Sequence, residues 1–146
     1  MIHEYLSADH ARLDAAMRNG DYEAFREGLL RHIGIEQKIL FPIVNDWPVV
    51  ERLHLDHGAL AALLVPTPTP AILAAIQTIL ENHNPLEEGN DGLYEQCERR
   101  LGARTAVVLK QIQTFPPVRV APNVDNQTSM ESARSALRCA GYSLEI

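Results

Sequence analysis

A short pattern that occurs twice constrains the fold of this chain more than any other feature. In each copy an Asp-His pair is followed, about one helix later, by a histidine with a glutamate four residues after it. The two copies comprise Asp9, His10, His32 and Glu36, and then Asp56, His57, His83 and Glu87. Residues four apart lie one turn apart on an α-helix, so each His/Glu pair projects from one helix face. The pattern therefore predicts two helical hairpins built on the same plan.

The first His/Glu pair interrupts a helix face that is otherwise apolar. Six residues share this face at helical spacing: Phe25, Leu29, His32, Glu36, Leu40 and Ile43. A buried imidazole or carboxylate is costly unless it is hydrogen-bonded, paired or bound to a metal. We therefore expect His32 and Glu36 to have polar or metallic partners at the same height in the fold.

Apolar periodicity and turn residues predict an all-α chain. The expected helices cover about residues 2–18, 22–45, 49–64 and 93–114, with a fourth helix that starts near Pro70 and a short last helix over 130–140. Pro42 favours a kink near residues 38–42 or an earlier end to the second helix, and Pro85 favours a kink or end in the fourth. Ser129 is the expected cap of the last helix. We expect helices one to four to form an up-down antiparallel four-helix bundle, with an extra C-terminal helix and tail.

The predicted turns bring the repeated histidines to one height. His10 and His32 are equidistant from position 21, and His57 and His83 are equidistant from position 70. With a rise of about 1.5 Å per residue, this layer lies roughly 16 Å from the loops. Six residues are predicted to meet there as metal ligands: His10, His32, Glu36, His57, His83 and Glu87.

Imidazole and carboxylate ligands without cysteine suit iron, manganese or zinc. Two carboxylates can each bridge two ions, and four histidines can supply two terminal ligands to each ion. Such a centre keeps open positions, where a small molecule such as O2 can bind. Without a metal, the layer would be a hydrogen-bonded polar core network of four imidazoles and two carboxylates.

The order and spacing of these residues resembles the hemerythrin-like (HHE cation-binding) family. Its pattern is DH, then HxxxE-x3-LFP, then a second H, then HxxxE followed by LY. Leu40-Phe41-Pro42 and Leu93-Tyr94 stand at the matching places, and the match covers about residues 1–100. The resemblance implies a non-haem di-iron site in an antiparallel bundle, with terminal histidines and bridging carboxylates.

The chain departs from the family pattern at several positions. Oxygen carriers commonly have a fifth histidine one turn before the third-helix ligand, where this chain has Leu53. The neighbouring His54 is either a fifth ligand or an exposed residue, and we favour the second. The fourth-helix carboxylate is either Glu87 or Glu88, and we favour Glu87 because its spacing matches that of the first copy. The residues 89–92 are an insertion before Leu93 that we expect to distort this region.

Composition narrows the class of function. The 146 residues carry a net charge of −6 without a basic run, which argues against nucleic acid or an anionic membrane as partner. No apolar run or N-terminal leader pattern predicts a membrane span or secretion. Cys97 and Cys139 form neither a disulfide framework nor a zinc-ligand cluster, so we expect a cytoplasmic protein with Cys97 packed as a small apolar residue. Tyr5 and Tyr94 are expected to pack rather than to act as redox relays.

We expect residues 1–114 to form the bundle and residues 115–146 to form the tail. The tail is open to packing on the bundle, to contact with a second copy as a homodimer or with another protein, and to mobility. Asp9 and Asp56 either accept hydrogen bonds from ligand imidazoles or face solvent. The function expected first is a di-iron protein that binds or senses O2, NO or peroxide without being an enzyme. The alternatives are a di-iron peroxidase or oxidase-like oxidoreductase and a metal-dependent regulatory interaction module.

Overall fold

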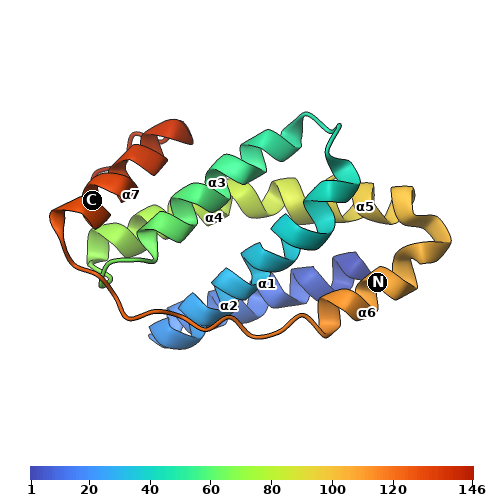
Figure 1. The fold of residues 1–146 in the computed structure, drawn as a ribbon, viewed down its shortest axis with the longest axis horizontal. Helices are drawn as coiled ribbons and strands as arrows, with labels where there is room; N and C mark the ends of the chain where they lie inside the picture. The colour runs from blue at the N-terminus through green and yellow to red at the C-terminus, as the bar shows by residue number, and fades with distance from the viewer. The chain divides into compact units, whose positions relative to one another are not determined.

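The computed structural model describes residues 1–146, and every regular element in it is helical (Figure 1). The predicted all-α class is therefore confirmed. The elements are α1 (Ile2–Arg18), α2 (Tyr22–Ile35), the π-helix η1 (Glu36–Leu40), the 3-10 helix η2 (Phe41–Val44), α3 (Val49–Leu63), α4 (Pro70–Glu88), α5 (Leu93–Leu101), the 3-10 helix η3 (Gly102–Arg104), α6 (Thr105–Gln113) and α7 (Gln127–Cys139). None of these helices combines the length and apolar content needed to span a bilayer.

The chain folds into two compact units. The first unit comprises Met1–Val50 and Asn84–Val120, and the second comprises Glu51–His83 and Ala121–Ile146. The first copy of the repeated pattern lies wholly in the first unit. The second copy is divided after His83, so its glutamate, Glu87, belongs to the first unit. The predicted four-helix bundle, and its division from a tail at residue 114, stay predictions.

In the first unit, α1 and α2 pack against each other as a hairpin (Figure 1). Gly20 closes the turn between them at a φ of 76°, and Asp21 then caps α2 by accepting a hydrogen bond from the Ala24 amide at 3.2 Å. Both helices bury the apolar stripes expected from their periodicity: Ile2, Leu6 and Leu13 from α1, and Phe25 and Leu29 from α2. The predicted first hairpin is therefore confirmed.

The α-helix ends at Ile35, and the chain continues as a π-helix before Pro42. Phe41 donates its amide hydrogen to the carbonyl of Glu36, five residues back, instead of four. Pro42 has no amide hydrogen, and it occupies the first turn of the 3-10 helix η2. The earlier end that Pro42 favours is therefore observed. The widened turn begins at Glu36, and such π segments are frequent at functional sites.

The helix predicted over residues 93–114 is wrong as a single element. It breaks at Gly102, where the backbone adopts a φ of +54° that other residues rarely accept, and resumes as α6. Before α5, the inserted turn brings Gly92 against the end of α4. A Cβ at Gly92 would lie 2.7 Å from the carbonyl oxygen of Glu87. The turn therefore fixes the start of α5, and with it Tyr94, close to Glu87.

In the second unit, α3 and α7 pack with the part of α4 that precedes Asn84. Their buried apolar side chains include Leu53, Leu60, Leu63, Ile72, Ile76, Ala133 and Leu137. Pro85 does not end α4, which continues to Glu88. The helix α7 begins at Gln127, earlier than predicted, because Asn126 rather than Ser129 is its N-cap. Ser129 instead completes a capping box with Asn126 from the third helical position.

The residues that precede α7 bind the proline-rich loop of the second unit. Val124 donates its amide hydrogen to the carbonyl of Val65 at 3.0 Å, and Asp125 accepts hydrogen bonds from the amide and hydroxyl of Thr67. At the other end of α7, Arg52 donates to the carbonyl of Ala140 at 2.7 Å. Of the arrangements considered for the tail, this segment therefore packs on its own chain.

Candidate metal centre

Four of the six predicted ligands gather within the first unit. They come from α1, α2, the π-helix and the last turn of α4: His10, His32, Glu36 and Glu87. One ligand atom of each lies within 4.8 Å of those of the others, and all four side chains are buried. We refer to these residues as the His/Glu group. Their buried nitrogen and oxygen atoms can hold a metal ion.

Asp9 orients the ring of His32 within this group. Its carboxylate accepts a hydrogen bond from Nδ1 of His32 at 2.8 Å, and the other oxygen accepts two from Arg12. Nε2 of His32 then faces Glu36, whose Oε2 lies 3.3 Å away. A carboxylate on Nδ1 fixes the tautomer and ring orientation of a metal-ligating histidine. Asp9 is thus an acceptor for a predicted ligand and does not face solvent.

In the absence of metal, His32 and Asp9 form a largely buried ion pair. Burial lowers the pKa of His32, but the charge of Glu36 and the hydrogen bond to Asp9 outweigh it and raise the pKa to about 10. Burial likewise opposes ionisation of Asp9, but hydrogen bonds from His32 and Arg12 outweigh it and lower its pKa to about 2. A proton on Nε2 of His32 therefore supplies the positive charge that a metal ion would otherwise bring.

His10 has a similar arrangement with carboxylates on both ring nitrogens. Its Nε2 lies 3.2 Å from Oε1 of Glu87, which is wholly buried. Its Nδ1 lies 3.3 Å from Oε2 of Glu88, whose side chain is 37% exposed. Glu87 therefore lies with the His/Glu group, whereas Glu88 contacts Nδ1 on the other edge of the His10 ring. The rings of His10 and His32 are 4.6 Å apart.

Tyr94 contacts the His/Glu group, although the sequence predicted only a packing role for this tyrosine. The side chain is wholly buried, and its hydroxyl donates a hydrogen bond to Oε2 of Glu36 at 2.8 Å. The hydroxyl oxygen of Tyr94 also lies 3.1 Å from Nε2 of His10 and 3.2 Å from Nε2 of His32. Burial and the charges of Glu36 and Glu87 raise the pKa of the phenol well above its ordinary value. The only sequence signal was its place in the Leu93-Tyr94 pair.

The other two predicted ligands lie together in the second unit. The rings of His57 and His83 are 4.9 Å apart, and both are buried. Asp56 accepts a hydrogen bond from Nδ1 of His83 at 3.0 Å, as Asp9 does from His32. Asp56 also accepts a hydrogen bond from the Tyr142 hydroxyl at 3.0 Å and lies 3.4 Å from the guanidinium of Arg52. Both copies of the pattern therefore place an aspartate on the histidine of the following helix.

The remaining candidates lie outside the His/Glu group and outside the pair of His57 and His83. His54 is exposed, while Leu53 beside it is buried. Cys97 is buried, and its thiol donates a long hydrogen bond of 3.7 Å to the carbonyl of Leu40. Burial, followed by the charge of Glu36, raises the pKa of this thiol to about 12, so it stays protonated and unreactive at neutral pH. The predicted packing role of Cys97 is confirmed.

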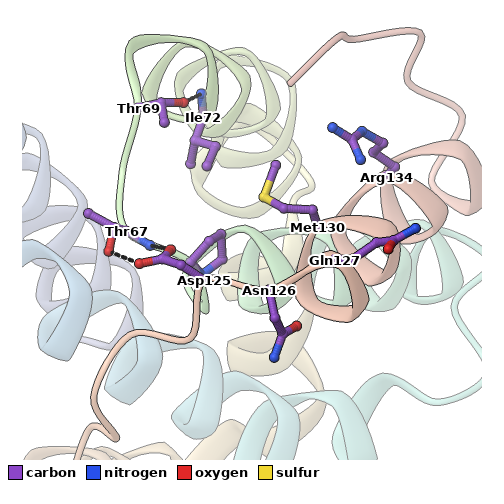
Figure 2. A pocket seen from close by; sticks show the side chains of 9 residues that line it. Thr67, Thr69, Ile72, Asp125, Asn126, Gln127, Met130 and Arg134 are labelled. Carbon is purple, nitrogen blue, oxygen red and sulfur yellow. Dashed lines mark hydrogen bonds between the residues drawn. The ribbon is translucent and has the colours of Figure 1, made fainter.

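The second unit has a surface hollow of about 470 Å³ beside the start of α7 (Figure 2). Its lining includes Ile72, Met130 and Arg134, and it contains neither histidine nor cysteine. Its one carboxylate, Asp125, already accepts hydrogen bonds from the amide and hydroxyl of Thr67 (Figure 2). This hollow therefore offers no metal ligand set.

No protein-family model, curated protein or solved structure matches the chain. A buried, oriented set of imidazole and carboxylate groups is suited to hold a metal cation.

Proposed function

We propose that the protein is a non-haem di-iron protein of the hemerythrin-like type that binds or senses O2, NO or peroxide. The observation that carries this proposal is the buried His/Glu group, with ligand atoms within 4.8 Å of one another. Two imidazoles and two carboxylates would otherwise be buried at a considerable cost. A divalent cation among them would offset the carboxylate charges and accept the Nε2 lone pairs of both imidazoles.

The type of metal follows from the donors. Imidazole and carboxylate groups suit iron, manganese and zinc, and the absence of thiolate donors argues against copper(I) and iron–sulfur clusters. We favour iron, with manganese or zinc as alternatives. Iron ions that keep open coordination positions would supply the capacity to bind a diatomic molecule or peroxide.

The full ligand set remains a proposal that rests on the repeated pattern and the family resemblance. We assign terminal roles to His10, His32, His57 and His83, and bridging roles to Glu36 and Glu87, in a two-ion centre of an up-down four-helix bundle. Glu87 is preferred over Glu88 because it is wholly buried. We also propose a cytoplasmic, reducing location, which the free thiols of Cys97 and Cys139 support.

The decisive experiment is metal analysis of the full chain purified without chelator, followed by iron loading in air. We expect bound iron and ligand-to-metal absorption, which changes on addition of NO or peroxide. His32→Ala should lose iron, whereas His54→Ala should keep it because His54 is exposed. A wild-type chain that binds no iron and shows no such absorption would refute the proposal.

One observation favours the regulatory alternative as a second candidate. The Tyr142 hydroxyl donates to Asp56, which also accepts from Nδ1 of His83. The C-terminal segment is thus hydrogen-bonded to the partner of a predicted ligand. If metal occupancy is transmitted here, limited proteolysis after Arg138 should differ between metal-loaded and metal-free protein, and Tyr142→Phe should remove the difference. Equal cleavage in both states would exclude this candidate, whereas sustained peroxide turnover with a reductant would favour the enzyme alternative.

A further inference from the structure

The buried Tyr94 hydroxyl occupies a position that suits a metal ligand better than a packing residue. Its oxygen lies 2.8 Å from Oε2 of Glu36, 3.1 Å from Nε2 of His10 and 3.2 Å from Nε2 of His32. These three atoms come from three different helical elements, so their convergence on one oxygen is a property of the tertiary fold.

The separations match the edges of a coordination polyhedron. With metal–ligand bonds of about 2.1 Å, neighbouring ligand atoms lie about 3.0 Å apart in an octahedral site and about 3.4 Å apart in a tetrahedral one. The three distances to the Tyr94 oxygen fall in or close to this range, as do the 3.3 Å between His32 and Glu36 and the 3.2 Å between His10 and Glu87. Each of these five pairs of donor atoms therefore has a separation that two ligands of one metal ion can adopt.

Hydrogen bonding alone accounts poorly for this convergence. The phenol has a single hydrogen, which it donates to Glu36. Carboxylates face Nδ1 of both rings, Asp9 at His32 and Glu88 at His10. The Nε2 proton of His32 can be donated to the phenol oxygen, whereas a neutral His10 that donates from Nδ1 would point the lone pair of its Nε2 at the same oxygen. A cation among these atoms satisfies all of them together.

The inserted turn fixes Tyr94 in this position. Gly92 has no room for a side chain, because a Cβ would lie 2.7 Å from the carbonyl oxygen of Glu87 and 2.8 Å from that of Leu86. Asp91 adopts a φ of 57°, and its amide donates to the carboxylate of Glu95 in the first turn of α5. The phenol is therefore held by the same turn that follows Glu87.

We propose that Tyr94 is a further ligand of the metal ion held by His10, His32, Glu36 and Glu87. This inference rests on the proposed function, since it requires iron at that group. On binding, the O–H bond of the phenol is replaced by an oxygen–iron bond, and the proton is released to the buffer. Phenolate oxygen is an established ligand of iron in haem proteins, and as a hard anionic donor it suits the ferric state.

The test compares the iron-loaded wild-type chain with Tyr94→Phe and with Tyr5→Phe. Tyr5 is the matched control, because it is a half-buried tyrosine on α1 outside the His/Glu group. We expect wild type and Tyr5→Phe to show a visible phenolate-to-iron(III) absorption band with tyrosinate vibrations in resonance Raman spectra. Tyr94→Phe should lose the band and these vibrations. Circular dichroism and iron content per chain establish that each variant is folded and loaded.

A measurement on the wild type alone keeps the proposal testable if Tyr94→Phe does not fold. Ring-deuterated tyrosine, incorporated biosynthetically, should shift the Raman vibrations enhanced in the charge-transfer band. Iron-loaded wild type that lacks tyrosinate vibrations would overturn the ligand assignment and leave the proposed function standing. A wild-type chain that takes up no iron would overturn both.

Discussion

The carboxylate behind His32 provides a sharp test of the metal centre. Asp9 accepts a hydrogen bond from Nδ1 of His32 at 2.8 Å, and its side chain is only 10% exposed. Asp9→Asn keeps an oxygen that can accept this hydrogen bond but removes the negative charge. The imidazole should then keep its orientation and become a weaker donor to the metal.

The expected loss follows from the role of such partners. Substituting a hydrogen-bond partner of a metal ligand typically lowers metal affinity by about 10- to 100-fold, or about 1.4 to 2.7 kcal/mol. We expect Asp9→Asn in the lower half of this range, since the hydrogen bond survives. Asp9→Ala should fall in the upper half, because ring orientation is lost as well.

The assay is competition for iron(II) or zinc between the protein and a chromophoric chelator. Asp14→Asn is the matched control, because Asp14 lies on the same helix, is 65% exposed and pairs with Arg18 at 2.9 Å. Its metal affinity should equal that of wild type. If Asp9→Asn binds metal as tightly as Asp14→Asn, the carboxylate does not support the metal centre, and the reasoning fails.

Three further outcomes follow from the same structure. Removal of metal by chelation should lower the unfolding temperature, because metal present at about 1,000 times its Kd contributes about 4 kcal/mol; an unchanged melting curve would show that no metal is bound. In metal-free protein, the raised pKa of His32 contributes stability that is complete below the ordinary histidine pKa of 6.5 and is lost as the pH rises to about 10. The lowered pKa of Asp9 contributes stability that is complete above the ordinary aspartate pKa of 3.8 and is lost as the pH falls to about 2. Urea titrations across pH should therefore show that this pair stabilises the fold most between about pH 4 and 6.5. Above pH 6.5, the free energy of unfolding should fall less steeply with pH in His32→Gln than in wild type. Asn126→Ala should cost about 1 kcal/mol of unfolding free energy through loss of the α7 cap, and a cost no greater than that of Gln127→Ala would contradict the capping role.

The sequence predicted the helices well where periodicity and a turn signal agree. The helix α1 runs from Ile2 to Arg18 as expected, because a buried stripe at helical spacing, which includes His10, is followed by an Asn-Gly-Asp turn. Prediction failed where one backbone angle decides the outcome. Gly102 breaks the predicted helix over residues 93–114, yet a lone glycine inside a periodic pattern is often tolerated. At α7, Asn126 and Ser129 lie three residues apart and both have side chains that can cap a helix, and only the structure shows that Asn126 is the N-cap.

The candidate site was likewise predicted only where regular helical spacing decides which residues meet. Spacing on a single helix was enough to pair His32 with Glu36, and the repeated Asp-His pair raised the question of what Asp9 and Asp56 contact. The structure gives each of these aspartates a histidine from the following helix. Tyr94 could not be assigned from spacing, because its position depends on an irregular turn whose geometry no periodicity encodes.

The division of the second copy after His83 has a consequence for any shortened chain. The first copy alone, with His10, His32 and Glu36, brings only three members of the buried group, and the fourth, Glu87, comes from the last turn of α4. A fragment that ends before Asn84 would therefore keep the first hairpin but lack one of the two buried carboxylates. Such a fragment would present an incomplete set of donors to a cation.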